Sequence, residues 1–485
     1  MGIYGLLYRK EEFCALQNLF LPLKFSFEME KISAGYVAFG TQFYEPGNLK
    51  WISERAEKQL TEAGLSLVKT DPVFGEGIEP ERAIRELKRE EWDFLFVNII
   101  NWIDTRGVFR VLHEFRNHPM ILYSFGGFTD SEGKFGQPGT LISPAAGAGS
   151  TSLRLVMEEW GIKFRYLFNA PDSPMDMEGI LSFAKAAAAV RKLKYARLGM
   201  IGFNDMGLYS TSVNPSRMRS EIGPELESVD MLQLDRKMKT IPDELVQKEV
   251  ARVTANWEYP LGEPEPEVIE KAVRLYLATV DICREKKFDS FSYKCVDGID
   301  LEMGLTHAIP SSLVADAGYP YVDENDLGNS AAQLMLKWIS GKQVTFIEHY
   351  EHHPEWILLG EDGYCPSDFI EGKPQIKYIS TVLLKGIAHC SDMKKGRMTL
   401  ASLAETKKGY RMHIVTGEAK QRPKWVEMGV PLPSWPSVTF YPDVPVRQIL
   451  DHVQSQHFAA CFGNYAKELK DICHILQIEC IDDTK

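Results

Sequence analysis

The first 200 residues alternate between short apolar runs and longer amphipathic segments. The apolar runs have the length of strands, and the segments between them have helical periodicity. The predicted strands are 33–39, 65–68, 94–98, 120–123, 164–168 and 197–202, and the predicted helices are 49–63, 79–90, 108–115, 151–160 and 177–193. Strands that alternate with helices indicate a parallel sheet with helices on both faces.

A glycine-rich stretch between residues 126 and 149 divides this alternation into two parts. Clustered glycines are typical of loops, so the stretch predicts a domain boundary. The pattern therefore predicts two Rossmann-like α/β domains with doubly wound parallel sheets. The first domain spans residues 31–149, and the second spans residues 150–325 and includes the strand at 164–168.

The pattern changes after residue 339, where candidate strands become short and helical signals almost vanish until residues 446–453. These candidate strands are 344–348, 356–359, 378–383, 397–401, 410–415 and 437–441. Several short strands separated by glycine and proline turns predict a β-barrel or a sandwich. We expect this third domain to span residues 326–485.

Composition excludes some functional classes without selecting one. The 485 residues carry 67 acidic and 55 basic side chains, a net charge of −12. With no sustained basic stripe, this charge argues against a broad surface for nucleic acid or anionic membranes. The eight cysteines show no CxxC pairing, which suits reduced thiols. The first 27 residues, interrupted by charges, predict neither a signal peptide nor a membrane span, so we expect a cytoplasmic protein.

Three separated polar clusters together offer the ligands of a divalent metal ion. They are Asp300-Leu301-Glu302, Glu324-Asn325-Asp326 and Gln456-His457. Two carboxylates and one imidazole would leave coordination positions open for a substrate. Each residue also has a simpler explanation. Asp326 can cap the helix predicted over 331–339, Glu302 can be a solvated acid at a helix start, and His457 can be a structural residue at a strand end.

Together with five further segments, these clusters resemble the superfamily of L-fucose isomerase and L-arabinose isomerase. The segments are 197–202, 206–211, 214–216, 398–401 and 413–419. In this resemblance Glu302, 24 residues before Asp326, corresponds to the first metal-binding carboxylate. Asp326 corresponds to the second, and His457 corresponds to the third ligand.

The resemblance implies a manganese-dependent aldose-ketose isomerase that acts on a free, non-phosphorylated pentose or 6-deoxyhexose. Magnesium and cobalt are the expected substitutes for manganese. Glu302 and Asp326 are then the catalytic pair that moves a proton through a cis-enediolate, and the assignment of base and acid stays open. The resemblance also implies a C-terminal β-barrel, residues 1–30 packed with the second domain, and a homo-oligomer, a trimer or a hexamer.

Two residues are candidates for contact with the sugar. Trp102 follows the strand at 94–98, and an aromatic face packs well against the C–H surface of a sugar. In the implied oligomer it would roof the site of a neighbouring copy, and packing in the core is its alternative role. Lys294 shortly precedes Glu302, where the resemblance implies a polar residue close to the substrate, and it is a candidate to donate a hydrogen bond to the sugar.

The main alternative is a catalytically silent sugar-binding or regulatory homologue. The turn at 359–366 departs from the turns expected in the family, since it carries acids in place of histidine or asparagine. A sugar receptor of the periplasmic type would need an export signal, which the sequence does not indicate.

Overall fold

A computed structural model describes residues 31–41, 46–125, 145–170, 173–381, 385–423 and 435–485. The expected packing of residues 1–30 lies outside this range. Two parallel sheets and a closed antiparallel barrel follow one another along the chain, which confirms the predicted fold class. In the described residues, no helix is long and apolar enough to cross a membrane.

The first sheet is wholly parallel and has the strand order β2-β1-β4-β5-β6, with β3 beside β1. Alternate residues of its strands point to opposite faces, so each face is apolar and needs a cover. Helices α2 and α6 cover one face, and helices α3, α4 and α5 cover the other. The elements are β1 (Ser33–Gly40), α2 (Pro46–Glu62), β2 (Ser66–Lys69), β3 (Val73–Phe74), α3 (Ile78–Leu87), β4 (Phe94–Ile99), α4 (Thr105–Glu114), β5 (Met120–Ser124), α5 (Ala146–Glu159), β6 (Phe164–Phe168) and α6 (Met177–Leu193).

The strand β6 was predicted to lie in the second domain, but it pairs in parallel with β5 of the first sheet. The physical reason is the helix before it. Leu153 and Met157 of α5 pack into the apolar core on the outer face of the first sheet, so the chain returns to that sheet's edge. The change of sheet occurs one strand later, along α6.

The second sheet is also parallel, in the order β10-β9-β7-β8. Its strands are β7 (Arg197–Ile201), β8 (Glu225–Val229), β9 (Ser290–Tyr293) and β10 (Tyr321–Val322), and the segments between them include α7 (Pro215–Arg217), η1 (Met218–Ile222), α8 (Met231–Thr240), α9 (Asp243–Thr254), α10 (Pro266–Lys286), η2 (Cys295–Glu302) and α11 (Ala308–Asp316). Parallel strands end at a common edge, and Val322 pairs with Ser292. The polar residues that follow β9 and β10 are therefore neighbours.

Six antiparallel strands form the barrel in the order β15-β18-β11-β12-β17-β16, and pairing of β15 with β16 closes it. The described part of the predicted segment 378–383 includes the end of β13, which pairs with β14 in a separate two-stranded sheet outside the barrel. The elements are β11 (Thr345–His352), β12 (Ile357–Gly360), η3 (Ser367–Phe369), β13 (Ile376–Ser380), β14 (Lys385–His389), β15 (Gly396–Thr406), β16 (Gly409–Gln421), β17 (Ser437–Pro442), α13 (Val446–His452), β18 (His457–Phe462), α14 (Ala466–Leu476) and β19 (Glu479–Asp483).

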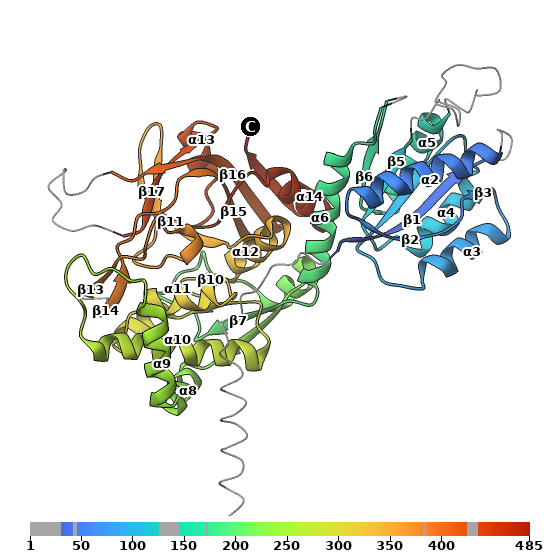
Figure 1. The fold of residues 1–485 in the computed structure, drawn as a ribbon. Coiled ribbons are helices and arrows are strands. Elements are labelled where there is room, and N and C mark those ends of the chain that lie inside the picture. The colour runs from blue at the N-terminus through green and yellow to red at the C-terminus, as the bar shows by residue number, and fades with distance from the viewer. Residues whose placement is uncertain (1–30, 42–45, 126–144, 171–172, 382–384, 424–434) are drawn as a thin grey trace, which may run out of the picture.

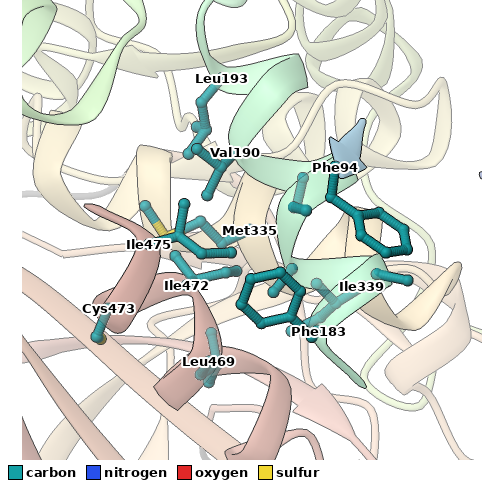
Figure 2. Close-up of a cluster of buried hydrophobic side chains, with 14 of the residues drawn as sticks. Phe94, Phe183, Val190, Leu193, Met335, Ile339, Leu469, Ile472, Cys473 and Ile475 are labelled. Carbon is teal, nitrogen blue, oxygen red and sulfur yellow. The ribbon is translucent and has the colours of Figure 1, made fainter. Parts of the chain in front are cut away.

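The helix α12 (Leu327–Ser340) confirms the helix predicted from the apolar run at 331–339. It lies between the second sheet and the barrel. Gly341 ends it in a left-handed conformation that suits glycine. Figure 2 shows side chains of α6, α12 and α14 meeting in one apolar cluster, which Phe94 of the first sheet joins. This cluster fixes α12, and therefore the residue at its N-terminus, against the barrel.

Removal of a large side chain from this cluster should destabilise the protein strongly. Phe183 of α6 is fully buried there, whereas Phe168 at the end of β6 is 62% exposed. We expect Phe183→Ala to lower the free energy of unfolding by about 3–5 kcal/mol and Phe168→Ala to change it by about 0.5 kcal/mol or less. Urea denaturation followed by circular dichroism measures both. Equal losses in the two variants would contradict the role of the cluster.

Candidate metal centre

A hydrogen bond joins the start of α12 to the first residue of β18. Asp326 is the N-cap of α12, and its carboxylate accepts from the Asn329 backbone N–H at 3.0 Å and from the Asn329 amide at 2.7 Å. The same carboxylate accepts a hydrogen bond from Nδ1 of His457 at 3.0 Å. Asp326 is thus a helix cap, which is one of the two roles that the sequence predicted for it. It also orients an imidazole.

The hydrogen bond at Nδ1 leaves Nε2 of His457 to face other groups. Nε2 lies 3.2 Å from Oε1 of Glu348 and 3.5 Å from Oε2 of Glu324. The ring is fully buried, and within the described part of the chain Nε2 has no hydrogen-bond partner. A carboxylate that holds one ring nitrogen and frees the other is the usual support of a metal-binding histidine.

The three groups have a spacing that fits one metal ion. Ligand atoms of Glu324, Glu348 and His457 all lie within 4.8 Å of one another. Bonds from such ions to oxygen and nitrogen are about 2.0–2.3 Å, so the ligands of one ion lie within about 4.6 Å of each other. The unpartnered, buried Nε2 and the two carboxylates therefore fit a divalent cation.

The barrel register places Glu348 beside His457. These two residues are directly paired across β11 and β18, so their side chains share a face. Ile347, the residue before Glu348, instead belongs to the apolar core that Phe458 and other barrel residues form. Alternation along β11 therefore sends Glu348 out of that core and toward α12.

Glu324 owes its position to an unusual backbone. Glu324 and the following Asn325 have φ angles of 58° and 54°, two successive left-handed residues without glycine. Such residues cost about 1–3 kcal/mol each and persist only where the surroundings hold them. The Asn325 N–H donates to the Tyr293 carbonyl at 3.0 Å, and its amide donates to the Phe203 carbonyl at 2.8 Å.

The residue before His457 also holds Glu324 in place. The amide of Gln456 donates to Oε2 of Glu324 at 2.7 Å, so both residues of the predicted Gln456-His457 pair contact this site. The carboxylate of Glu324 is thereby aimed at His457.

A second histidine has similar surroundings a short distance away. His307 directly precedes α11, and its Nδ1 lies 3.1 Å and 3.2 Å from the two oxygens of Asp300. Its Nε2 lies 3.3 Å from Asp323 and 3.7 Å from Asp362. Glu361 and Asp362 follow β12, whose last residue Gly360 is paired with Glu348. The two histidines therefore share one acid-rich region.

The buried carboxylates have altered pKa values. Burial raises the pKa of Glu324 to about 7 and that of Asp362 to about 6, and it raises the pKa of Glu361 well above its usual range. Burial alone would lower the pKa of His457, but the Asp326 and Glu348 carboxylates outweigh it and hold that pKa well above its ordinary value. The region therefore attracts cations.

The structure brings together only some of the site residues predicted from sequence. Asp326 and His457 are in contact, but Glu302 is exposed at the end of η2, and among the described contacts its carboxylate reaches neither of them. The π-helical turns of η2 point Asp300 inward, to His307, and leave Glu302 outside. The residues grouped with His457 are thus Glu324 and Glu348.

The two predicted sugar contacts lie at the edges of the two parallel sheets. Lys294 follows β9, and its amine lies 3.6 Å from a carboxylate oxygen of Asp297. Trp102 follows β4 and is 45% exposed, so it does not pack in the core. The first sheet, to which β4 belongs, stands apart from the barrel in Figure 1.

Glu348, His307, Glu361 and Asp362 are not among the site residues predicted from the sequence. The acid Glu348 sits in an otherwise apolar strand start, Phe346-Ile347, and that polar position was the available signal. The acids Glu361 and Asp362 form the turn that had been noted as a departure from the family.

A pair of matched substitutions separates the two candidate ligand sets. We expect Glu348→Gln to weaken Mn²⁺ binding at least about 10-fold, because loss of even an outer partner of a metal ligand costs 10-fold to 100-fold. Glu302→Gln should leave the affinity unchanged. Isothermal titration of metal-free protein with Mn²⁺ measures both. Weaker binding in Glu302→Gln, with normal binding in Glu348→Gln, would restore the set expected from the sequence.

Comparison with known proteins agrees with the resemblance seen in the sequence. Residues 372–482 match the family model described as L-fucose isomerase, C-terminal domain. A sulfoquinovose isomerase from Alkalicoccus urumqiensis is 19% identical over 345 residues, which cover 69% of this chain and 75% of that protein. Sulfoquinovose isomerases from Priestia aryabhattai and Priestia megaterium are 18% identical over 462 residues, which cover 93% of this chain and 99% of theirs.

A solved structure of a glucose-galactose binding protein from Geobacillus stearothermophilus aligns with 64% of this chain at 12% identity, with a TM-score of 0.16, from which nothing follows for the fold. The match of residues 372–482 to this family model and the three relatives together confirm the resemblance to the L-fucose isomerase superfamily.

Proposed function

We propose that the protein is a metal-dependent aldose-ketose isomerase that acts on a free, non-phosphorylated sugar. The observation that carries this proposal is the buried Nε2 of His457, which faces Glu324 and Glu348 without a hydrogen-bond partner among the described residues. The match to an L-fucose isomerase domain and three relatives named as sugar isomerases support the same reaction class.

Glu324, Glu348 and His457 would hold the divalent ion. Two carboxylates and one imidazole form a mixed, mostly hard ligand set that suits manganese, with magnesium or cobalt as substitutes. When bound, the ion supplies Lewis acidity toward the carbonyl and hydroxyl oxygens of the sugar. Asp326 acts through His457, because its carboxylate already accepts three hydrogen bonds. We therefore assign Asp326 a positioning role.

Glu324 is the carboxylate best suited to move the proton. Its carboxylate lies 3.5 Å from Nε2 of His457, beside the proposed ion, where a general base could reach the proton of a sugar held there. Gln456 occupies its Oε2, and within the described residues its Oε1 has no hydrogen-bond partner. In the reaction, Oε1 would take the proton from C2 of the open-chain aldose and return it to C1. The hydroxyl proton moves from O2 to O1, which completes the conversion to the ketose.

The substrate class follows from charge. Carboxylates line the region around both histidines, and this field favours an uncharged sugar over an anionic one. A pentose or a 6-deoxyhexose is uncharged and remains the proposed substrate. The alternative is a silent homologue that keeps the fold and binds a sugar without converting it.

An isomerisation assay tests the reaction. With Mn²⁺ present, we expect the protein to convert at least one sugar from a panel of free pentoses and 6-deoxyhexoses. Glu324→Gln at saturating Mn²⁺ should lower kcat by at least about 10²-fold, because it removes the proton acceptor. Glu302→Gln is the matched control and should keep full activity.

The reaction in heavy water distinguishes proton transfer from a hydride shift. Proton transfer through an enediolate should place solvent deuterium at C1 of the ketose, as mass spectrometry would detect. Product without any deuterium would favour a hydride shift. A metal-loaded protein that converts no sugar in the panel would support the silent homologue.

We further propose a homo-oligomer in which Trp102 of one copy covers the site of another. Its exposure, and its position after a strand of the sheet that stands apart from the barrel, make it available to a second copy. Analytical ultracentrifugation should show an assembly larger than a monomer, and Trp102→Ala should raise KM more than it lowers kcat. A fully active monomer would contradict this arrangement.

A further inference from the structure

The geometry points to a second divalent-cation site, formed by His307, Asp323, Glu361 and Asp362, beside the centre at His457. The proposed isomerisation uses one ion, so this site goes beyond it. The residues follow β10 and β12 and precede α11, and they come together where the edge of the second sheet meets the barrel.

The first observation is a buried imidazole nitrogen that faces two carboxylates. His307 is 1% exposed, and Nε2 makes no hydrogen bond within the described parts of the chain. The ring is held through Nδ1 by Asp300, while Nε2 lies 3.3 Å from Asp323 and 3.7 Å from Asp362. This arrangement repeats that of Asp326, His457 and the two glutamates, with one carboxylate behind the ring and others in front.

The second observation is that the carboxylates in front of His307 converge on one another. Oxygens of Asp323, Glu361 and Asp362 lie within 4.8 Å of one another. Across the described residues, Oε2 of Glu361 and Oδ1 of Asp362 are buried without a hydrogen-bond partner. Buried anions placed this close repel each other strongly unless a cation or protons lie between them.

The number of charges favours an ion over a protonated histidine alone. Asp300, Asp323 and Asp362 lie close to a single imidazole, and Glu361 converges with Asp323 and Asp362 in front of it. One proton on His307 balances one of them. A divalent cation at Nε2 would satisfy the three in front of the ring, and Asp300 would keep its hydrogen bond to Nδ1.

The donor set selects the kind of cation. Three carboxylates and one imidazole are mainly hard ligands, which suit Mg²⁺ or Mn²⁺. Cys295 also lies within reach of His307 and Asp323, but burial raises the pKa of its thiol well above the usual value, and the thiol donates toward Asp205. A neutral thiol is a poor ligand, so a soft metal is not favoured.

Counting bound ions tests the site without an activity measurement. Metal-free protein is equilibrated with Mn²⁺ alone, and the ions retained per chain are counted by elemental analysis and by titration calorimetry. We expect two Mn²⁺ per chain. The two ions should also be close enough to broaden the electron paramagnetic resonance spectrum beyond that of an isolated Mn²⁺.

Variants assign each ion to its centre. Asp362→Asn and His307→Gln should each reduce the count from two to one, and Glu348→Gln should remove the other ion. Asp362→Asn is the milder substitution, because the side chain of Asp362 is 30% exposed. It therefore tests the site even where His307→Gln fails to fold.

One Mn²⁺ per chain in the wild type would overturn the second site. If Glu348→Gln then abolished that single ion, the proposed isomerase centre would stand without its neighbour. Two ions retained in Asp362→Asn and in folded His307→Gln would also overturn the assignment. Absence of any bound Mn²⁺ would contradict both this site and the metal dependence of the proposed function.

Discussion

The hydrogen bond between Asp326 and His457 connects the two halves of the candidate site. The Asp326 carboxylate caps the N-terminus of α12 and also orients the ring of a barrel histidine. Because α12 packs on both the second sheet and the barrel, its cap lies where the two meet. A small shift of this helix would move the imidazole and the glutamates relative to each other, so the apolar cluster of α6, α12 and α14 serves the chemistry as well as stability.

Buried negative charge is the second constraint on this region. The fold places carboxylates from the loops after β9 and β10, from strand β11 and from the turn after β12 around two imidazoles. Burial, with a further contribution from neighbouring carboxylates, raises the pKa values of Glu324, Glu361 and Asp362. Such an arrangement is unfavourable for folding by itself, since the charged forms are desolvated. A bound cation would offset the repulsion between these carboxylates and stabilise the folded protein, which links metal binding to stability.

The sequence predicted the fold more fully than the site. Alternating strands and helices, and later the short strands, follow directly from apolar periodicity, whereas the sheet that β6 joins depends on how α5 packs. Asp326 and His457 were predicted through motifs. Glu302 was predicted from the family resemblance, but the turns of a π-helix decide which acid of Asp300-Leu301-Glu302 points inward, and a motif does not encode this. Glu348 was missed because its partner in the barrel is more than 100 residues away.

The two left-handed residues Glu324 and Asn325 have a consequence for engineering. Main-chain torsions, held by the hydrogen bonds of Asn325 to the Tyr293 and Phe203 carbonyls, and the hydrogen bond from Gln456 together set the direction of Glu324. Transplanting the ligands alone into another α/β scaffold would therefore misdirect this glutamate. A graft that works has to carry the adjoining ends of β7, β9 and β10 as one unit, so the smallest portable version of this site is a piece of sheet edge.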